Sequence, residues 1–171
     1  MIYSLQQGVP FKKAPLFGLN CVSKKIHSQT ANLIDLKIEN IYETFEIDKL
    51  TLCYTRNLFE EEKESVAKKC SHVLLADIDH FKKINDTYGH DYGDFVLREI
   101  AKIIKNSVRS TDRVYRFGGE EFLIVLFNTT DNQAYTIAER IRKEIETHTP
   151  TTITIGISRC NNDIDHAIKK S

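Results

Sequence analysis

The chain has 171 residues, 41% hydrophobic and 28% charged, which is enough for one well-packed soluble domain with an appendage but not for two full domains. The chain has 24 lysines and arginines and 24 aspartates and glutamates, so its net charge is zero. It therefore has no overall positive electrostatic potential that would attract nucleic acid or an anionic membrane. Four scattered cysteines without a Cys-x-x-Cys pair, and no run of about 18 apolar residues, predict a cytoplasmic location without zinc or a membrane segment.

The first element predicted along the chain is a helix over residues 28–47. Its apolar residues Ile34, Ile38, Ile41 and Phe45 recur at steps of four, three and four, which places them on one stripe. Two such helices could pair as a short coiled coil, or the helix could lie on its own domain, and two heptads do not decide between these. We assign residues 1–47 to an N-terminal segment with a signalling or linker helix from about residue 28.

The next elements alternate between helix and strand. Periodicity predicts a helix over 58–69, a buried strand over 73–77 that ends in acidic residues, and a short helical turn over 81–85. After an interruption by glycines, a helical period resumes over 94–109.

A hairpin and a closing helix and strand follow. The hairpin arms are 114–117 and 122–127, a capping box at Thr130 precedes a helix over 134–147, and a last strand covers 151–158. The order strand, helix, hairpin, helix, strand predicts an α+β, ferredoxin-like fold, with a mainly antiparallel sheet and helices on one face.

The hairpin turn carries the residues with the clearest chemistry. Glu120 and Glu121 directly follow Gly118-Gly119, and glycines supply the positive φ angles that a two-residue turn needs. Asp77 ends a strand that we expect nearby. Carboxylates from neighbouring strands could share Mg²⁺.

Three motifs at matching spacing resemble the GGDEF domain of bacterial diguanylate cyclases, in its GGEEF form. They are Gly118-Gly119-Glu120-Glu121-Phe122, the run DIDHFKKIND from Asp77 to Asp86, and Gly89-His90-Asp91-x-Gly93-Asp94. The resemblance covers about residues 48–171 and implies a palm-type nucleotidyl cyclase. Such an enzyme condenses two GTP molecules into cyclic di-GMP and two pyrophosphates, with one GTP held by each domain of a catalytic homodimer.

The resemblance also implies roles for these motif residues. Asp77, the backbone carbonyl of Ile78 and Glu120 would bind Mg²⁺, or Mn²⁺ in its place, beside the Gly118-Gly119 turn. Glu121 would either bind a second metal ion or accept the proton of the attacking ribose 3′-hydroxyl. The attack is on the α-phosphate.

Substrate contacts are implied by the second and third motifs. Asn85 and Asp94 would read guanine, because a carboxylate accepts from guanine N1–H and the exocyclic amine, whereas adenine offers an acceptor at N1. Lys82 and the backbone amides of His80 and Phe81 would bind the triphosphate.

An Arg-x-x-Asp pair, Arg109 and Asp112, ends five residues before the Gly-Gly pair. At that place it matches the family's inhibitory product site, where the guanidinium would bind cyclic di-GMP and the carboxylate a second guanine edge. Arg140 matches a secondary contact of the same site. Cyclic di-GMP would then be a feedback inhibitor.

The chain departs from the family pattern at two places. The family's opening motif, Asp-x-Leu-Thr-Gly-Leu-x-Asn-Arg, is kept at Asp48 and Arg56, but Leu52 and Thr55 replace its glycine and asparagine. We expect this to alter local turn geometry and signal coupling more than catalysis. The family also continues past Ser171 into a helix whose Lys and Arg bind phosphates, so the domain at 48–171 is expected to lack that helix, to bind triphosphate weakly and to turn over poorly.

Two rival functions remain open at this point. The first is a non-enzymatic receptor for GTP or cyclic di-GMP from the same family, which the intact acids at 77, 120 and 121 argue against. The second is a structural dimerisation module. The input signal is not encoded in these motifs, and further regions of a longer protein could attach it to a membrane.

Overall fold

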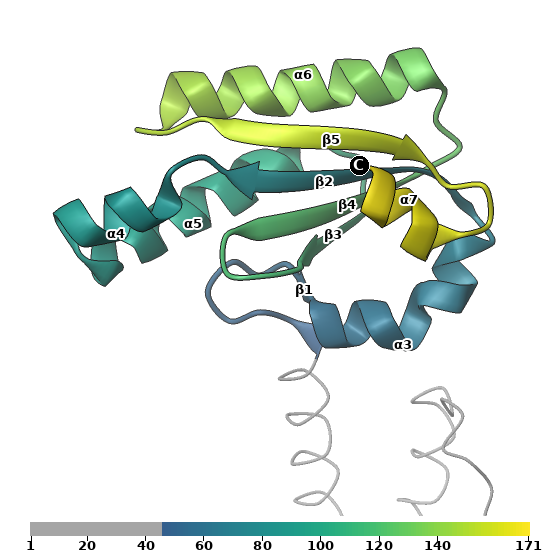
Figure 1. Cartoon of the computed structure of the whole chain (residues 1–171), viewed down its shortest axis with the longest axis horizontal. Coiled ribbons are helices and arrows are strands. Elements are labelled where there is room, and N and C mark those ends of the chain that lie inside the picture. Colours follow the sequence, from purple (N-terminus) through teal and green to yellow (C-terminus); the bar gives the residue numbers. More distant parts are fainter. Residues whose placement is uncertain (1–45) are drawn as a thin grey trace, which may run out of the picture. The chain divides into compact units, whose positions relative to one another are not determined.

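The computed structural model describes residues 46–171 (Figure 1). The predicted helix over 28–47 lies outside these residues except for its last two. The described elements, in chain order, are β1 (Tyr54–Thr55), α3 (Arg56–Ala67), β2 (Cys70–Ile78), α4 (Phe81–Tyr88), α5 (His90–Asn106), β3 (Arg113–Arg116), β4 (Glu121–Phe127), α6 (Asp131–His148), β5 (Ile153–Arg159) and α7 (Ile164–Lys170).

The sheet has the order β1-β3-β4-β2-β5. Strand β4 is central and pairs antiparallel with β3 and β2, β2 also pairs antiparallel with β5, and the short edge strand β1 is parallel to its neighbour β3. Apart from β1, the order β3-β4-β2-β5 is that of a split βαβ fold. The predicted ferredoxin-like, mainly antiparallel α+β architecture is therefore confirmed.

Helices cover both faces of the sheet, so the expectation that they pack on one face is wrong. Alternate residues of β4 divide between two hydrophobic clusters: Phe122, Ile124 and Leu126 pack with α4, α5 and α6, whereas Leu123 and Val125 pack with α3 and α7. The physical reason is visible in the uninterrupted apolar run of β4, because a strand buried on both faces has no polar alternation.

The boundaries of α4 and α5 differ from the predicted ones. Helix α4 continues to Tyr88 and α5 already begins at His90, so the two helices meet at Gly89 and Gly93 lies inside α5. Gly89 has φ +86°, a conformation that glycine adopts without strain, and this single residue makes the turn between the helices. The predicted capping box of α6, formed by Thr130 and Gln133, is confirmed.

The turn before β1 is held together by the side chain of Asp48. The Asp48 carboxylate accepts hydrogen bonds from the Thr51 amide at 2.8 Å and the Thr51 hydroxyl at 2.6 Å. Leu52 occupies the glycine position with φ +56°, and its side chain is 63% exposed. A leucine there is strained, because a Cβ atom disfavours the left-handed region.

Cys53, Cys70 and Cys160 are free and buried. Within residues 46–171, no helix combines the length and apolar character needed to cross a membrane.

Candidate active site

The acidic residues from two motifs meet at one end of the sheet. In the antiparallel pairing of β2 with β4, Asp77 lies directly opposite Glu121, and the Ile78 amide donates to the Glu120 carbonyl at 3.4 Å. The β3–β4 turn and α4 lie at this same end, on the left of Figure 1. Asp77 is exposed there, while Ile78 is buried and anchors the strand end.

The Gly-Gly turn differs from the two-residue turn that we expected. The amides of Phe117 and Gly118 both donate to the Glu121 carbonyl, at 2.8 and 3.2 Å, so Gly118, Gly119 and Glu120 form a three-residue loop. Neither glycine has a positive φ. Gly118 instead leaves room for a side chain, because a Cβ built on it would overlap Oε2 of Glu121 and force that carboxylate to move. The Glu121 carboxylate therefore folds back over Gly118.

Arg116 fixes this loop, a role that sequence reasoning missed. Its Nε and Nη2 donate to the Gly119 carbonyl at 3.2 and 2.9 Å, and its Nη1 lies 3.2 Å from both carboxylate oxygens of Asp48. Burial raises the pKa of Asp48, but the Thr51 hydrogen bonds and the Arg116 charge outweigh it, so the net pKa shift is downward. The site turn and the opening turn are thus joined by one ion pair.

Asp79 is a second residue whose role was not recognised. Its carboxylate accepts hydrogen bonds from the hydroxyls of Thr152 and Thr154. Its amide donates to the Thr152 carbonyl at 3.1 Å, and its carbonyl accepts from the Thr151 hydroxyl at 2.7 Å. Asp79 therefore fastens the end of β2 to β5. No local sequence signal reveals these partners, because they lie more than 70 residues away.

The donor set at this end of the sheet fits a hard divalent cation. The available donors are carboxylate and backbone carbonyl oxygens, which Mg²⁺ prefers. Partial desolvation of the Asp77 carboxylate and the negative charge of Asp79 raise the pKa of Asp77, so a positive ion bound here would relieve repulsion. Among residues 46–171, no three acidic, histidine or cysteine side chains are gathered as a closed metal cluster. The strand register brings the acidic positions together, while the Glu121 side chain lies over Gly118.

The predicted phosphate contacts lie where β2 passes into α4. His80 has φ +57° and precedes the helix without capping it through its side chain. The amides at the start of a helix have no intrahelical acceptor, so this first turn can donate to an anion. Phe81 is buried and orients the turn, whereas the Lys82 side chain is exposed.

The two predicted guanine readers lie on adjoining helices. Asn85 is on α4 and Asp94 on α5, and the Asn85 amide packs against the Cα of Gly93, the residue before Asp94. Asp94 is exposed and Asn85 is partly buried. The helix pair joined by Gly89 thus brings the Asn85 amide beside the residue that precedes Asp94.

The loop that holds Arg109 and Asp112 is stabilised from within. Asp112 is 7% exposed, and its two carboxylate oxygens accept from the backbone amides of Arg109 at 2.9 Å and Phe127 at 3.2 Å. The carboxylate therefore shapes the loop. The Arg109 side chain is exposed, and Arg140 donates to the carbonyl of Ser107, so both arginines belong to the same region.

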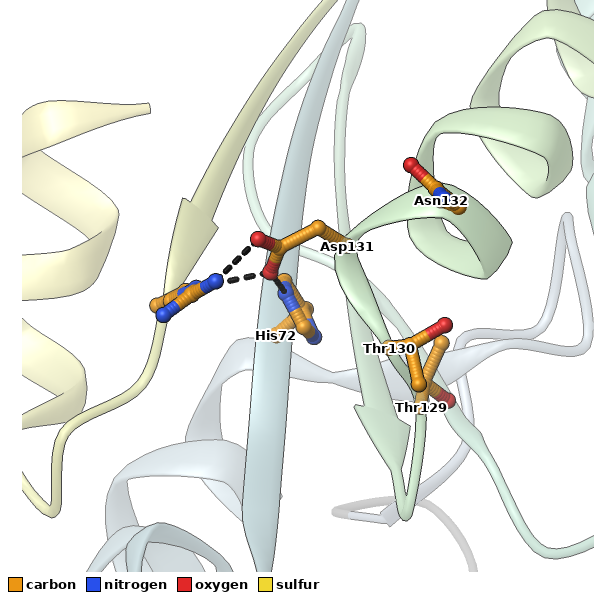
Figure 2. A pocket seen from close by; sticks show the side chains of 6 residues that line it. His72, Thr129, Thr130, Asp131 and Asn132 are labelled. Atoms are coloured by element: carbon orange, nitrogen blue, oxygen red, sulfur yellow. Dashed lines mark hydrogen bonds and ion pairs between the residues drawn. The ribbon is translucent and has the colours of Figure 1, made fainter.

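A hollow of about 450 Å³ lies at the other end of β2 and contains none of the predicted site residues (Figure 2). Asp131, at the start of α6, accepts from His72 Nε2 at 2.8 Å and pairs with the Arg159 guanidinium. The His72 Nδ1 is buried and has no hydrogen-bond partner among the described residues. This cluster ties α6 to β2 and β5.

Comparison with known proteins points to one family. The chain is 43% identical over 140 residues to diguanylate cyclase A of Treponema denticola, covering 77% of this chain and 36% of that protein. It is 41% identical over 120 residues to the response regulator PleD of Caulobacter vibrioides, covering 67% of this chain and 26% of that protein. The chain therefore spans about a third or less of these relatives.

Solved structures agree with this assignment. The GGDEF domain of DgcB from Caulobacter crescentus, in complex with c-di-GMP, is 25% identical and has a TM-score of 0.64, covering 72% of this chain and 84% of that one. Diguanylate cyclase SiaD of Pseudomonas aeruginosa, in complex with its activator SiaC, is 27% identical with a TM-score of 0.64, covering 91% of this chain and 66% of that one. The model of the diguanylate cyclase GGDEF domain matches residues 45–170. With this match, the strand pairing around the Gly-Gly-Glu-Glu turn and the split βαβ sheet, the chain belongs to the GGDEF family.

Proposed function

We propose that this chain is a diguanylate cyclase domain, which condenses two GTP molecules into cyclic di-GMP and releases two pyrophosphates. The reaction joins the 3′-oxygen of each ribose to the α-phosphorus of the other nucleotide. The bond from that phosphorus to the β-phosphate oxygen breaks, and pyrophosphate leaves with the electron pair. The observation that carries the proposal is the register of β2 with β4, which sets Asp77 opposite Glu121 beside the Gly-Gly turn. The relatives named diguanylate cyclase support it.

In this proposal the acidic residues bind the cation that offsets the negative charge of the phosphates. Asp77, the Ile78 carbonyl and Glu120 bind a divalent cation, Mg²⁺ or Mn²⁺. When bound, such a cation lowers the pKa of a coordinated hydroxyl and neutralises phosphate charge. Glu121 either completes a second cation site or accepts the hydroxyl proton. The Arg116 contact with Gly119 keeps this loop in place while charge develops.

The nucleotide would lie along the path from α4 to α5. The first-turn amides of α4 and Lys82 bind the phosphates, which replaces part of their hydration with fixed donors. Asn85 and Asp94 read the guanine edge. Adenine would leave the Asp94 carboxylate facing an acceptor, and an unpaired charge beside a bound base is costly.

Because each domain offers one such nucleotide site, a catalytic homodimer is part of the proposal. The two copies would present their nucleotides to each other, so that each ribose hydroxyl reaches the other α-phosphate. Product would also bind at Arg109, with Arg140 as a secondary contact, and inhibit the enzyme. The GGDEF domain of DgcB was solved in complex with c-di-GMP, which supports the proposal that this domain also binds its product.

Incubation of the chain with GTP and Mg²⁺, followed by chromatographic separation and mass determination of the products, tests the proposal. We expect a species with the mass of cyclic di-GMP, and pyrophosphate in a ratio of two to one. Binding of GTP without this product would favour a non-enzymatic receptor, and absence of any nucleotide binding would favour a dimerisation module.

A further inference from the structure

Gly93 lies under the side chain of Asn85, at a point where an added Cβ atom would force a neighbouring side chain to move. A Cβ atom built at position 93 would overlap Asn85 Oδ1 and would lie 3.0 Å from Asn85 Cγ and 3.3 Å from Phe81 Cζ. Side chains pack at van der Waals distance, so any residue larger than glycine must displace one of these neighbours. The nearest one is the Asn85 amide.

Backbone conformation does not account for this glycine. Gly93 is inside α5, a region where alanine is favoured over glycine, and it does not have a positive φ. Gly89 is different, because its φ of +86° is needed for the turn between α4 and α5. The property that position 93 requires is therefore space for Asn85.

The two helices are held close enough for this contact by several interactions. The Gly89 amide donates to the Asn85 carbonyl at 2.9 Å, and the Gly93 amide donates to the Gly89 carbonyl at 3.2 Å. The rings of Tyr88 and Tyr92 pack with their centroids 5.0 Å apart across the turn. The backbones of Asn85 and Gly93 are thereby fixed relative to each other, and the remaining freedom is that of the Asn85 side chain.

We propose that Gly93 is a positioning residue that sets nucleotide specificity through Asn85. With only a Cα at position 93, the Asn85 amide lies beside the backbone that leads into Asp94, so an amide and a carboxylate are presented to one purine edge. A methyl group at 93 moves the amide away and removes its contact with guanine. This inference rests on the proposed function, because it assumes that Asn85 and Asp94 read the base.

A double-mutant cycle with Gly93→Ala and Asn85→Ala on the full chain tests the proposal. The probes are 3′-deoxy-GTP and 3′-deoxy-ATP, which lack the attacking hydroxyl and so bind without reacting. Dissociation constants are measured by calorimetry with Mg²⁺, and thermal unfolding verifies the fold of each variant. Glu99→Ala, on the same helix, is the control for a change that does not touch Asn85.

We expect Gly93→Ala and Asn85→Ala each to weaken 3′-deoxy-GTP binding about tenfold, the effect of one lost hydrogen bond, with 3′-deoxy-ATP binding unchanged. The double variant should match Asn85→Ala alone. Wild-type affinity in Gly93→Ala, or losses that add in the double variant, would overturn the inference. A wild-type chain that does not prefer the guanine nucleotide would instead overturn the proposed function.

If Gly93→Ala does not fold, Asn85→Gln takes its place, because it moves the amide by one methylene without adding an atom at position 93. The same tenfold loss for the guanine nucleotide is expected. Unchanged guanine affinity in Asn85→Gln would show that the amide position does not matter, and the inference would then be wrong.

Discussion

Asp77 and Glu121 are direct partners across the antiparallel pairing of β2 with β4, although 44 positions separate their numbers in the chain. The neighbouring Glu120 contributes its backbone carbonyl to the same pairing, through the Ile78 amide. Among residues 46–171 the Glu120 side chain has no hydrogen bond or ion pair, so changing it should affect chemistry more than folding.

Glu120→Gln is expected to lower the rate of cyclic di-GMP formation more than about 100-fold, because it removes the charge of a proposed cation ligand without changing the volume. The melting temperature should stay within about 1 °C of wild type, since the carbonyl at position 120 is retained. Product formation by chromatography and thermal unfolding measure the two effects. Glu61→Gln, at an exposed position on α3, is the matched control and should keep full activity; equal rates in both variants would refute the role of Glu120.

Leu52→Gly should stabilise the domain by about 0.5 to 1 kcal/mol. Leucine in the left-handed region costs about 1 to 2 kcal/mol, and part of this relief is offset by the larger unfolded-state entropy of glycine. The leucine side chain is mostly exposed, so little burial is lost. Urea unfolding measures the change. Leu52→Ala is the control, because it shortens the side chain but keeps Cβ and should bring no gain; equal stabilisation by both variants would exclude backbone strain as the cause.

Arg109→Ala should weaken cyclic di-GMP binding by about tenfold or more, because a guanidinium contact to an anionic ligand is a charge-assisted one. The initial rate should change little, whereas product should accumulate further at late times. Calorimetric titration with cyclic di-GMP and a full progress curve test both parts. Arg98→Ala, on the exposed face of α5, serves as the control. If wild type itself shows no product binding, the inhibitory site is absent.

The ion pair between Asp131 and Arg159 predicts how the stability of the domain depends on pH. Hydrogen bonds from Arg159 and then from His72 lower the pKa of Asp131 in the folded state. A carboxylate with a lowered folded pKa contributes stability above its unfolded pKa of about 3.9, and loses it as pH falls toward the folded value. Asp131→Asn should therefore be less stable than wild type at pH 6, and the difference should shrink below about pH 4.

Denaturant unfolding of both proteins between pH 6 and pH 3 measures this difference. Asp91→Asn, at an exposed position in the first turn of α5, is the comparison variant. A gap between wild type and Asp131→Asn that does not change with pH would show that the Asp131 charge contributes no stability through these partners.

Much of the fold could be predicted from the sequence because its signals are local. Each of these signals lies within one element: the capping box at Thr130, the helical period of α5 and the apolar run of β4. The order of the elements along the chain then permits only a few strand orders in the sheet. The covering of both faces was missed because α3 and α7 were not recognised as partners for the second face of β4.

The acidic site positions were also predictable, because motif spacing fixes them. The supports of the site were not: Arg116 contacts Asp48 across 68 positions, and Asp79 contacts Thr154 across 75. Such pairs exist only after the sheet has formed. The positive φ angles predicted for the turn glycines are not observed, and Gly118 instead leaves room for the Glu121 carboxylate.

The central claim, that this domain makes cyclic di-GMP, is tested most directly by incubating the chain with GTP labelled with ³²P at the α-phosphate, together with Mg²⁺. The label should pass into a single product with the mass and chromatographic mobility of cyclic di-GMP. The product should be absent when Mg²⁺ is chelated, and absent in Asp77→Asn. If the verified, folded chain binds GTP yet leaves all of the label in GTP, with Mn²⁺ as well as with Mg²⁺, the account is contradicted and the site is a receptor.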